Sequence, residues 1–196
     1  MISIDQAYDV MTAHIPLLLA IVAVLWIVHI INVSMNHRLN VFGIIPRRRI
    51  GLFGIIFSPF LHGDFGHLIT NSVMFLLLGM LVASYGLDIF IAASILIILF
   101  SGILTWLFGR KAIHIGASSL LMGYWSFLLV LAYFYPSAFT IFVAAICIIQ
   151  LGYLVYSLLP TGGQVSWEGH LFGFISGIGV CLLLPLIMPF IYQLVH

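Results

Sequence analysis

The chain has 196 residues, of which 64% are hydrophobic and only 6% are charged, and its formal net charge at pH 7 is +1. Charged residues make up about a quarter of a typical soluble domain, so this composition excludes an ordinary soluble protein and indicates an integral membrane protein. The small charge and the few basic residues argue against a nucleic-acid partner. The lipid bilayer is the expected environment, and we expect one transmembrane domain over residues 1–196.

Six apolar segments are long enough to cross a bilayer, because a spanning helix needs about 20 mostly apolar residues. In chain order the predicted spans are Ile15–Val33, His67–Tyr85, Asp88–Phe108, Ser118–Tyr135, Phe139–Leu159 and Gly169–Leu194. The predicted fold class is therefore an all-α polytopic membrane protein, a bundle of six transmembrane helices joined by one long loop and several short ones.

The long connection is the first one, over residues 34–66. It carries two prolines, the arginines Arg38, Arg47, Arg48 and Arg49, and an apolar stretch from Ile50 to Leu61. A loop of this length is usually functional or disordered, and its apolar content argues against a freely solvated segment. We expect short helices that lie in the membrane interface against the bundle, where the arginine run can bind lipid phosphates or act as a simple anchor.

Polar side chains gather where alternate predicted helices begin. His62, His67 and Asn71 lie at the start of the second helix, Ser118 opens the fourth, and His170 opens the sixth. Helices in a serial bundle alternate in direction, so the second, fourth and sixth helices all start from the same membrane face. Because polar groups at membrane depth are costly to bury, we expect these side chains to converge on one site.

Each of these groups also has a purely structural explanation. Ser118 can cap a helix, His67 and Asn71 share a helix face and can bond to a neighbouring helix, and His170 can be a buried structural histidine. Their shared membrane face favours a function instead. A serine with a histidine suggests a nucleophile and its general base, and a histidine with an asparagine suggests hydrogen-bond donors for a developing oxyanion.

Small residues recur along the sixth predicted helix. Gly169, Gly173 and Gly177 are spaced four residues apart, and such a stripe lets the backbone of another helix approach closely. His170 lies next to this stripe, so we expect it to lie obliquely toward the helix that packs there.

Taken in order on six spans, these motifs resemble those of the rhomboid intramembrane serine proteases, over nearly all of the chain. The matching residues are His62, His67 and Asn71 as His-x4-His-x3-Asn, Gly116-Ala117-Ser118 as Gly-x-Ser, and His170 followed by Gly173 and Gly177. The resemblance implies that Ser118 is the nucleophile and that His170 is its general base, without a carboxylate. It also implies an oxyanion hole formed by the side chains of His67 and Asn71 and the backbone N–H of Ser118, with His62 as a supporting residue.

The sequence departs from the commonest family pattern at several positions, and it lacks a Trp-Arg pair that some members have in the first loop. Ser119 stands where glycine is frequent, and its hydroxyl is a minor rival nucleophile. Met122 stands where an aromatic residue often packs on the histidine, and its thioether can still pack on an imidazole. Glu168 lies close to His170 in sequence, but a dyad needs no acid, so we assign Glu168 to the surface of the preceding loop.

The predicted activity is that of an intramembrane serine endopeptidase that cleaves transmembrane segments of membrane proteins without a cofactor. One alternative is a catalytically silent relative that binds or extracts membrane helices. Another is a metal or haem site built from His62, His67, His114 and His170. The spacing of five between the first two histidines suits one helix face poorly, and no acidic or cysteine ligand joins them. The sequence leaves the physiological substrate and the oligomeric state open.

Two lines of reasoning conflict on the orientation in the membrane. All lysine and arginine residues fall in the first and third loops. The charged residues predicted on the opposite face are the acidic Asp5, Asp9 and Asp88, without a lysine or arginine. The positive-inside rule would therefore place the site in the cytoplasm. The resemblance implies a site on the outer side of a bacterial inner (plasma) membrane. We follow the resemblance, because the arginines of the first loop can have structural roles.

Overall fold

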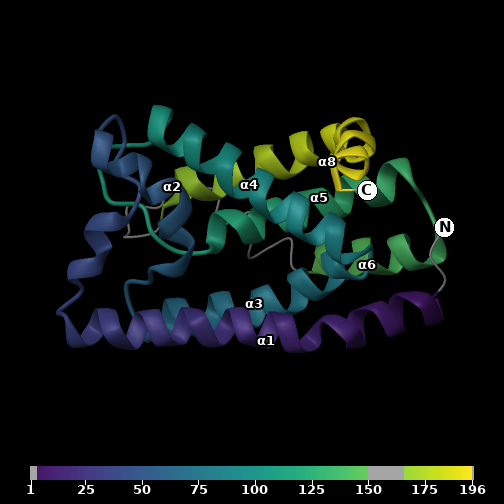
Figure 1. Ribbon diagram of the computed structural model, residues 1–196, viewed down its shortest axis with the longest axis horizontal. Helices are drawn as coiled ribbons and strands as arrows, with labels where there is room; N and C mark the ends of the chain where they lie inside the picture. Colours follow the sequence, from purple (N-terminus) through teal and green to yellow (C-terminus); the bar gives the residue numbers. More distant parts are fainter. Residues whose placement is uncertain (1–3, 150–165, 196) are drawn as a thin grey trace.

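The computed structural model describes residues 4–149 and 166–195, and its regular structure there is helical apart from one isolated β-bridge, between Ile44 and His114. The long helices are α1 (Ile4–Ser34), α3 (Phe65–Ala83), α4 (Leu87–Phe108), α5 (Ser118–Phe134), α6 (Ala138–Ile149) and α8 (Trp167–Val195). Figure 1 shows α1 along one edge of the bundle with α3 beside it. The first loop lies at the end where α3 and α8 begin, opposite the end at which α1 starts.

In the part of the chain that the structure describes, four helices are long and apolar enough to cross a membrane. They are α1 over Thr12–Ser34, α3 and α4 over their full lengths, and α8 over Trp167–Pro189. The prediction of an all-helical polytopic membrane protein is confirmed, whereas the number of six spans is not. Helices α5 and α6 are apolar but shorter in the described residues, with 17 and 12 residues. The second half of the fifth predicted span, Phe139–Leu159, lies outside the described residues.

Helix α5 is the central element of the bundle. It packs against α3, α4, α6 and α8, and most of its side chains are buried. Its buried polar atoms find partners: the Tyr124 hydroxyl bonds to that of Ser94 at 2.6 Å, and the Trp125 indole N–H donates to the Cys147 carbonyl at 2.9 Å. A helix of 17 residues rises about 25 Å, which is less than the about 30 Å of a hydrocarbon core. A central helix of this length leaves room for a polar recess at its start.

The first loop folds into short helical segments, as its apolar content predicted. They are η1 (Arg38–Phe42), η2 (Arg49–Leu52), α2 (Gly54–Phe57) and η3 (Ser58–Phe60). The loop is bonded to the end of α4. The Arg47 guanidinium donates to the Leu107 carbonyl at 2.8 Å, and the Trp106 indole N–H donates to the Arg48 carbonyl at 2.9 Å. Arg47 therefore has a structural role, because it satisfies a carbonyl that the helix end leaves unpaired.

Candidate active site

The first turn of α3 is fixed by a side-chain cap. Asp64 precedes the helix, and its carboxylate accepts a hydrogen bond from the backbone N–H of His67 at 2.8 Å. This bond holds the pKa of Asp64 below its ordinary value. His67 thus lies on a well-defined first turn, and Asn71 follows one turn later on the same face, where it is 4% exposed. The Asn71 Nδ2 donor is buried and has no hydrogen-bond partner among the described residues.

The loop before α5 meets these two side chains at Gly116. A Cβ on Gly116 would lie 2.6 Å from Cε1 and 2.7 Å from Nε2 of His67, and 3.5 Å from Nδ2 of Asn71. Gly116 also has φ of +112°, a conformation that L side chains rarely adopt. Only a glycine fits here, and its absent side chain lets the imidazole and the amide lie against the backbone two residues before Ser118. The structure therefore brings the starts of α3 and α5 together.

Helix α8 contacts α5 along the glycine stripe. A Cβ on Gly173 would lie 2.1 Å from the carbonyl oxygen of Ser119, and one on Gly177 would lie 2.0 Å from that of Gly123. The backbones of the two helices are therefore in contact, as the four-residue spacing predicted. His170 lies one turn before Gly173 and is 8% exposed. It is near enough to His67 for charges on the two rings to interact.

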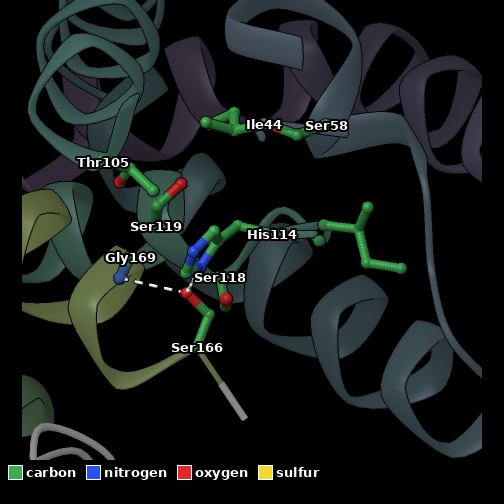
Figure 2. A pocket seen from close by; sticks show the side chains of 10 residues that line it. Ile44, Ser58, Thr105, His114, Ser118, Ser119, Ser166 and Gly169 are labelled. Atoms are coloured by element: carbon green, nitrogen blue, oxygen red, sulfur yellow. Dashed lines mark hydrogen bonds between the residues drawn. The ribbon is translucent and has the colours of Figure 1, made fainter. Parts of the chain in front are cut away.

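A small recess opens beside the first residues of α5 (Figure 2). It is lined by Ile44, Ser58, Thr105, His114, Ile115, Gly116, Ser118, Ser119, Ser166 and Gly169. Its volume of about 10 Å³ is about the space that one water molecule needs. Ser118 and Ser119 are both half-buried. Five hydroxyl groups and one imidazole line the recess, so it is polar enough to hold water next to Ser118.

Two residues of this recess, His114 and Ser166, were not predicted as part of the serine site. The Ser166 hydroxyl lies 2.6 Å from Nδ1 of His114 and accepts the backbone N–H of Gly169 at 3.1 Å. Burial lowers the pKa of His114, which keeps its imidazole neutral at neutral pH. The signal for Ser166 was available, because a serine directly before an apolar helix is a preferred N-cap. His114 had been weighed only as a metal ligand, and its partner lies 52 residues away.

The assignment of Glu168 to a loop surface is wrong. Helix α8 begins at Trp167, so Glu168 lies in its first turn, where it is only 4% exposed. Its Oε1 lies 3.6 Å from Nε of Arg110 and accepts the Arg110 backbone N–H at 3.4 Å. The physical reason is that a carboxylate in the first turn is favoured by the helix dipole, and here it also faces a cation on the α4–α5 loop.

His62 lies behind His67, with the two ring centroids 5.1 Å apart, and it is fully buried. The pKa of His62 is lowered to about 3. The main cause is burial, and the nearby imidazoles of His67 and His29 contribute less. His62 is thus a neutral ring that packs against His67 from the side of the first loop. Within residues 4–149 and 166–195, no group of three or more histidine, cysteine or acidic side chains is arranged to hold a metal ion.

These features define a class of protein: a polytopic helical membrane protein with a polar recess at the start of a buried central helix. The chain belongs to the rhomboid family, since the Rhomboid domain matches residues 49–186. It is similar to the uncharacterized protein Rv1337 of Mycobacterium tuberculosis (strain ATCC 25618 / H37Rv), with 36% identity over 176 residues, which cover 85% of this chain and 73% of the relative. The uncharacterized protein Mb1372 of Mycobacterium bovis gives the same values, and ML1171 of Mycobacterium leprae is 35% identical over 85% of this chain and 70% of its own length. The predicted family is thereby confirmed, and the names of these relatives state no activity.

Proposed function

We propose that this protein is an intramembrane serine endopeptidase that cleaves transmembrane segments of other membrane proteins. The observation that supports this most directly is the close approach at Gly116. There the imidazole of His67 and the amide of Asn71 lie against the backbone that leads into Ser118. A hydroxyl at a helix start, with side-chain donors beside it and an imidazole on the adjoining helix, is an arrangement suited to acyl transfer.

In the proposed reaction, Ser118 Oγ attacks the carbonyl carbon of the peptide bond while His170 takes the hydroxyl proton. The same proton then passes from His170 to the leaving amine, and water releases the acyl group in a second, equivalent step. Serine without a base is a weak nucleophile, so both residues are required. Their helices are held together by the backbone contact between Gly173 and Ser119.

The developing oxyanion needs donors that are already in place. Asn71 Nδ2 is buried and has no hydrogen-bond partner among the described residues, so it can bind an anion without breaking another bond. The backbone N–H of Ser118 is the first of α5, and the first four N–H groups of a helix have no partner within it. The positive end of the helix dipole adds to this stabilisation. His67, on the same face of α3 as Asn71, completes the proposed oxyanion hole.

Hydrolysis also needs water at membrane depth. The polar recess next to Ser118 has room for about one water molecule. The short central helix supports a site sunk below one surface while the rest of the bundle stays dry. A substrate that enters from the lipid would be a transmembrane helix that unwinds near its end, and helix-breaking or small residues there would ease the unwinding.

The proposed function is tested by cleavage of a single-span substrate in proteoliposomes, together with labelling by a serine-directed fluorophosphonate. We expect Ser118→Ala and His170→Ala to lose nearly all cleavage, and Ser118→Ala to lose the label. Ser119→Ala is the matched control, because it removes the adjacent hydroxyl of the same recess, and it should keep both activities. A Ser118→Ala protein that cleaves like the parent would contradict the assignment. A parent that neither cleaves nor takes the label, yet binds the substrate helix, would identify a silent family member instead.

We further propose that the recess faces the outer side of a bacterial inner membrane. The positive-inside rule favours the opposite orientation, but at least Arg47 in the first loop is bonded to the end of α4 and contributes to the fold. A reporter enzyme fused after His196 decides between them. A reporter that is active in the cytoplasm supports the proposed orientation, because α8 begins at the recess and is long enough to carry the chain to the opposite side of the membrane.

A further inference from the structure

The start of α8 is bonded to the loop that leads into Ser118. We propose that His114, acting through Ser166, is a positioning residue that fixes the first turn of α8 and so sets where His170 lies relative to Ser118. This inference rests on the proposed function and adds to it a determinant of the dyad geometry. It concerns residues outside the three motifs of the site, and Figure 2 shows the side chains involved.

The partners of His114 fix the direction of its hydrogen bonds. Its Nε2 lies 3.1 Å from the carbonyl oxygen of Arg110, which can only accept, so Nε2 carries the proton. In the neutral ring Nδ1 is then an acceptor, and the Ser166 hydroxyl donates to it at 2.6 Å. The Ser166 oxygen in turn accepts the N–H of Gly169 at 3.1 Å. A continuous chain of hydrogen bonds thus runs from the α4–α5 loop into the first turn of α8.

Ser166 contacts the first turn of α8 through both its side chain and its backbone. Its hydroxyl caps the helix at Gly169, and its carbonyl accepts the backbone N–H of His170 at 3.2 Å. Displacement of Ser166 would therefore displace the backbone that carries the proposed base. The position of this turn is therefore one determinant of where the imidazole of the proposed base lies.

His114 is itself held in a rigid frame. It is 4% exposed, and its backbone exchanges two hydrogen bonds of 2.9 Å with Ile44 of the first loop. Gly116, two residues later, donates its N–H to the carbonyl of Ser58 at 2.9 Å. The loop between these positions ends at Ser118. The imidazole of His114 therefore joins the backbone frame of the proposed nucleophile to the helix of the proposed base.

A second link joins the same two segments. The carboxylate of Glu168, in the first turn of α8, lies against the backbone N–H and the guanidinium of Arg110 in the same loop. Glu168 is 4% exposed, whereas the side chain of Arg110 is 41% exposed, so the carboxylate is buried and its cation lies at the surface. The two links end on Glu168 and Gly169, which are successive residues in the first turn of α8. Together they restrict rotation of the helix start as well as its translation. We use the His114 link for the test because its two ring nitrogens can be replaced separately.

A matched pair of amide substitutions separates the two bonds of the imidazole. In His114→Asn the short amide reaches the place of Nδ1 and can still accept the Ser166 hydroxyl. In His114→Gln the longer amide reaches the place of Nε2 and can bond the Arg110 carbonyl, but it leaves Ser166 without its partner. Both variants lose the ring, so a loss of packing affects them alike. Ser166→Thr keeps the hydroxyl and serves as the rescue variant for Ser166→Ala.

We expect kcat for the single-span substrate to fall about 10- to 100-fold in His114→Gln, since a misplacement of about 1 Å typically costs about 10²-fold. KM should change little, because the role proposed for His114 is to position His170 and not to bind the substrate. His114→Asn and Ser166→Thr should stay within about threefold of the parent, and Ser166→Ala should resemble His114→Gln. Amide hydrogen exchange in the first turn of α8, measured by mass spectrometry, should speed up in His114→Gln and not in His114→Asn.

The inference is overturned if the two His114 variants have equal kcat and equal exchange in the first turn of α8. It is also overturned if only KM changes. A parent protein that fails to cleave any substrate and to react with the fluorophosphonate would refute the proposed function, and the exchange measurement would still decide whether His114 fixes the start of α8.

Discussion

The backbone contact between α5 and α8 gives the sharpest test of how the site is assembled. Replacing Gly173 with alanine adds one methyl group that would lie 2.1 Å from the Ser119 carbonyl oxygen, 2.8 Å from its carbonyl carbon and 2.9 Å from its Cα. All three atoms belong to the backbone, so no side chain can rotate away. The two helices must separate for the variant to fold.

The size of this effect follows from the geometry. Ordinary van der Waals contact begins near 3.4 Å, so the added Cβ is more than 1 Å too close. Overpacking of this kind typically costs about 1–3 kcal/mol of stability. His170 lies one turn before Gly173, and a shift of about 1 Å at the proposed base should lower kcat about 10²-fold. Gly179→Ala is the matched control on the same helix, because a Cβ there has no described atom within 4 Å.

The assay compares thermal unfolding in detergent with cleavage of the single-span substrate in proteoliposomes. Gly173→Ala should have a lower Tm and a kcat about 10²-fold below the parent, whereas Gly179→Ala should match or exceed the parent in Tm, since alanine favours a helix by about 1 kcal/mol over glycine. If Gly173→Ala unfolds and cleaves like Gly179→Ala, the backbone contact does not set the geometry of the site.

Three further predictions test separate parts of the structure. Asn71→Ala should lower kcat about 10²- to 10³-fold, the usual cost of one oxyanion donor, and a kcat within threefold of the parent would exclude Asn71 from that role. The buried His62 has a pKa of about 3 in the folded protein against 6.5 in the unfolded chain, so the unfolded state binds the proton more readily. Through His62 alone, stability should therefore fall as the pH drops from about 6.5 toward 3, by about 2 kcal/mol at pH 5. The loss of Tm between pH 7 and pH 5 should be clearly smaller in His62→Gln than in the parent, and what remains comes from other buried histidines such as His114. Arg47→Ala should lower Tm because it removes the bond to the Leu107 carbonyl, at a cost of about 1 kcal/mol, and Arg49→Ala should not. Equal Tm values for these two arginine variants would assign Arg47 no structural role.

Much of the arrangement could be predicted from two simple features of the sequence. Alternation of helix direction placed the polar starts of three helices on one face, and the structure brings His67 and Asn71 to the loop before Ser118. The four-residue spacing of glycines in the last helix predicted its close contact with α5, which Gly173 makes at the carbonyl of Ser119. These features are visible in the sequence because the first depends only on the order of the helices along the chain and the second only on residue spacing within one helix.

Other features depend on contacts between distant segments and could not be predicted. The count of six spans is not confirmed, because α5 and α6 have only 17 and 12 residues in the part of the chain that the structure describes. The last helix was predicted to begin at Gly169, but α8 begins two residues earlier, at Trp167. The cap at Ser166 marks this earlier start. Glu168 was therefore predicted to lie on a loop surface, whereas it is buried in the first turn of α8. Its partner Arg110 lies 58 residues away, so the local sequence does not indicate this contact.

The distribution of polar contacts suggests how the proposed pair of Ser118 and His170 would be held in place without a third residue. At the end where α5 starts, the connecting loops are bonded to one another through Ile44, His114 and Ser166, and the helices below are joined by backbone contact at Gly173. The start of the helix that carries His170 is therefore confined by the loop that carries Ser118. A carboxylate that orients a histidine limits the rotation of the ring; here we infer that restraint of the backbone on both sides serves the same purpose. Loosening either restraint should consequently lower kcat while leaving the buried core around α5 intact.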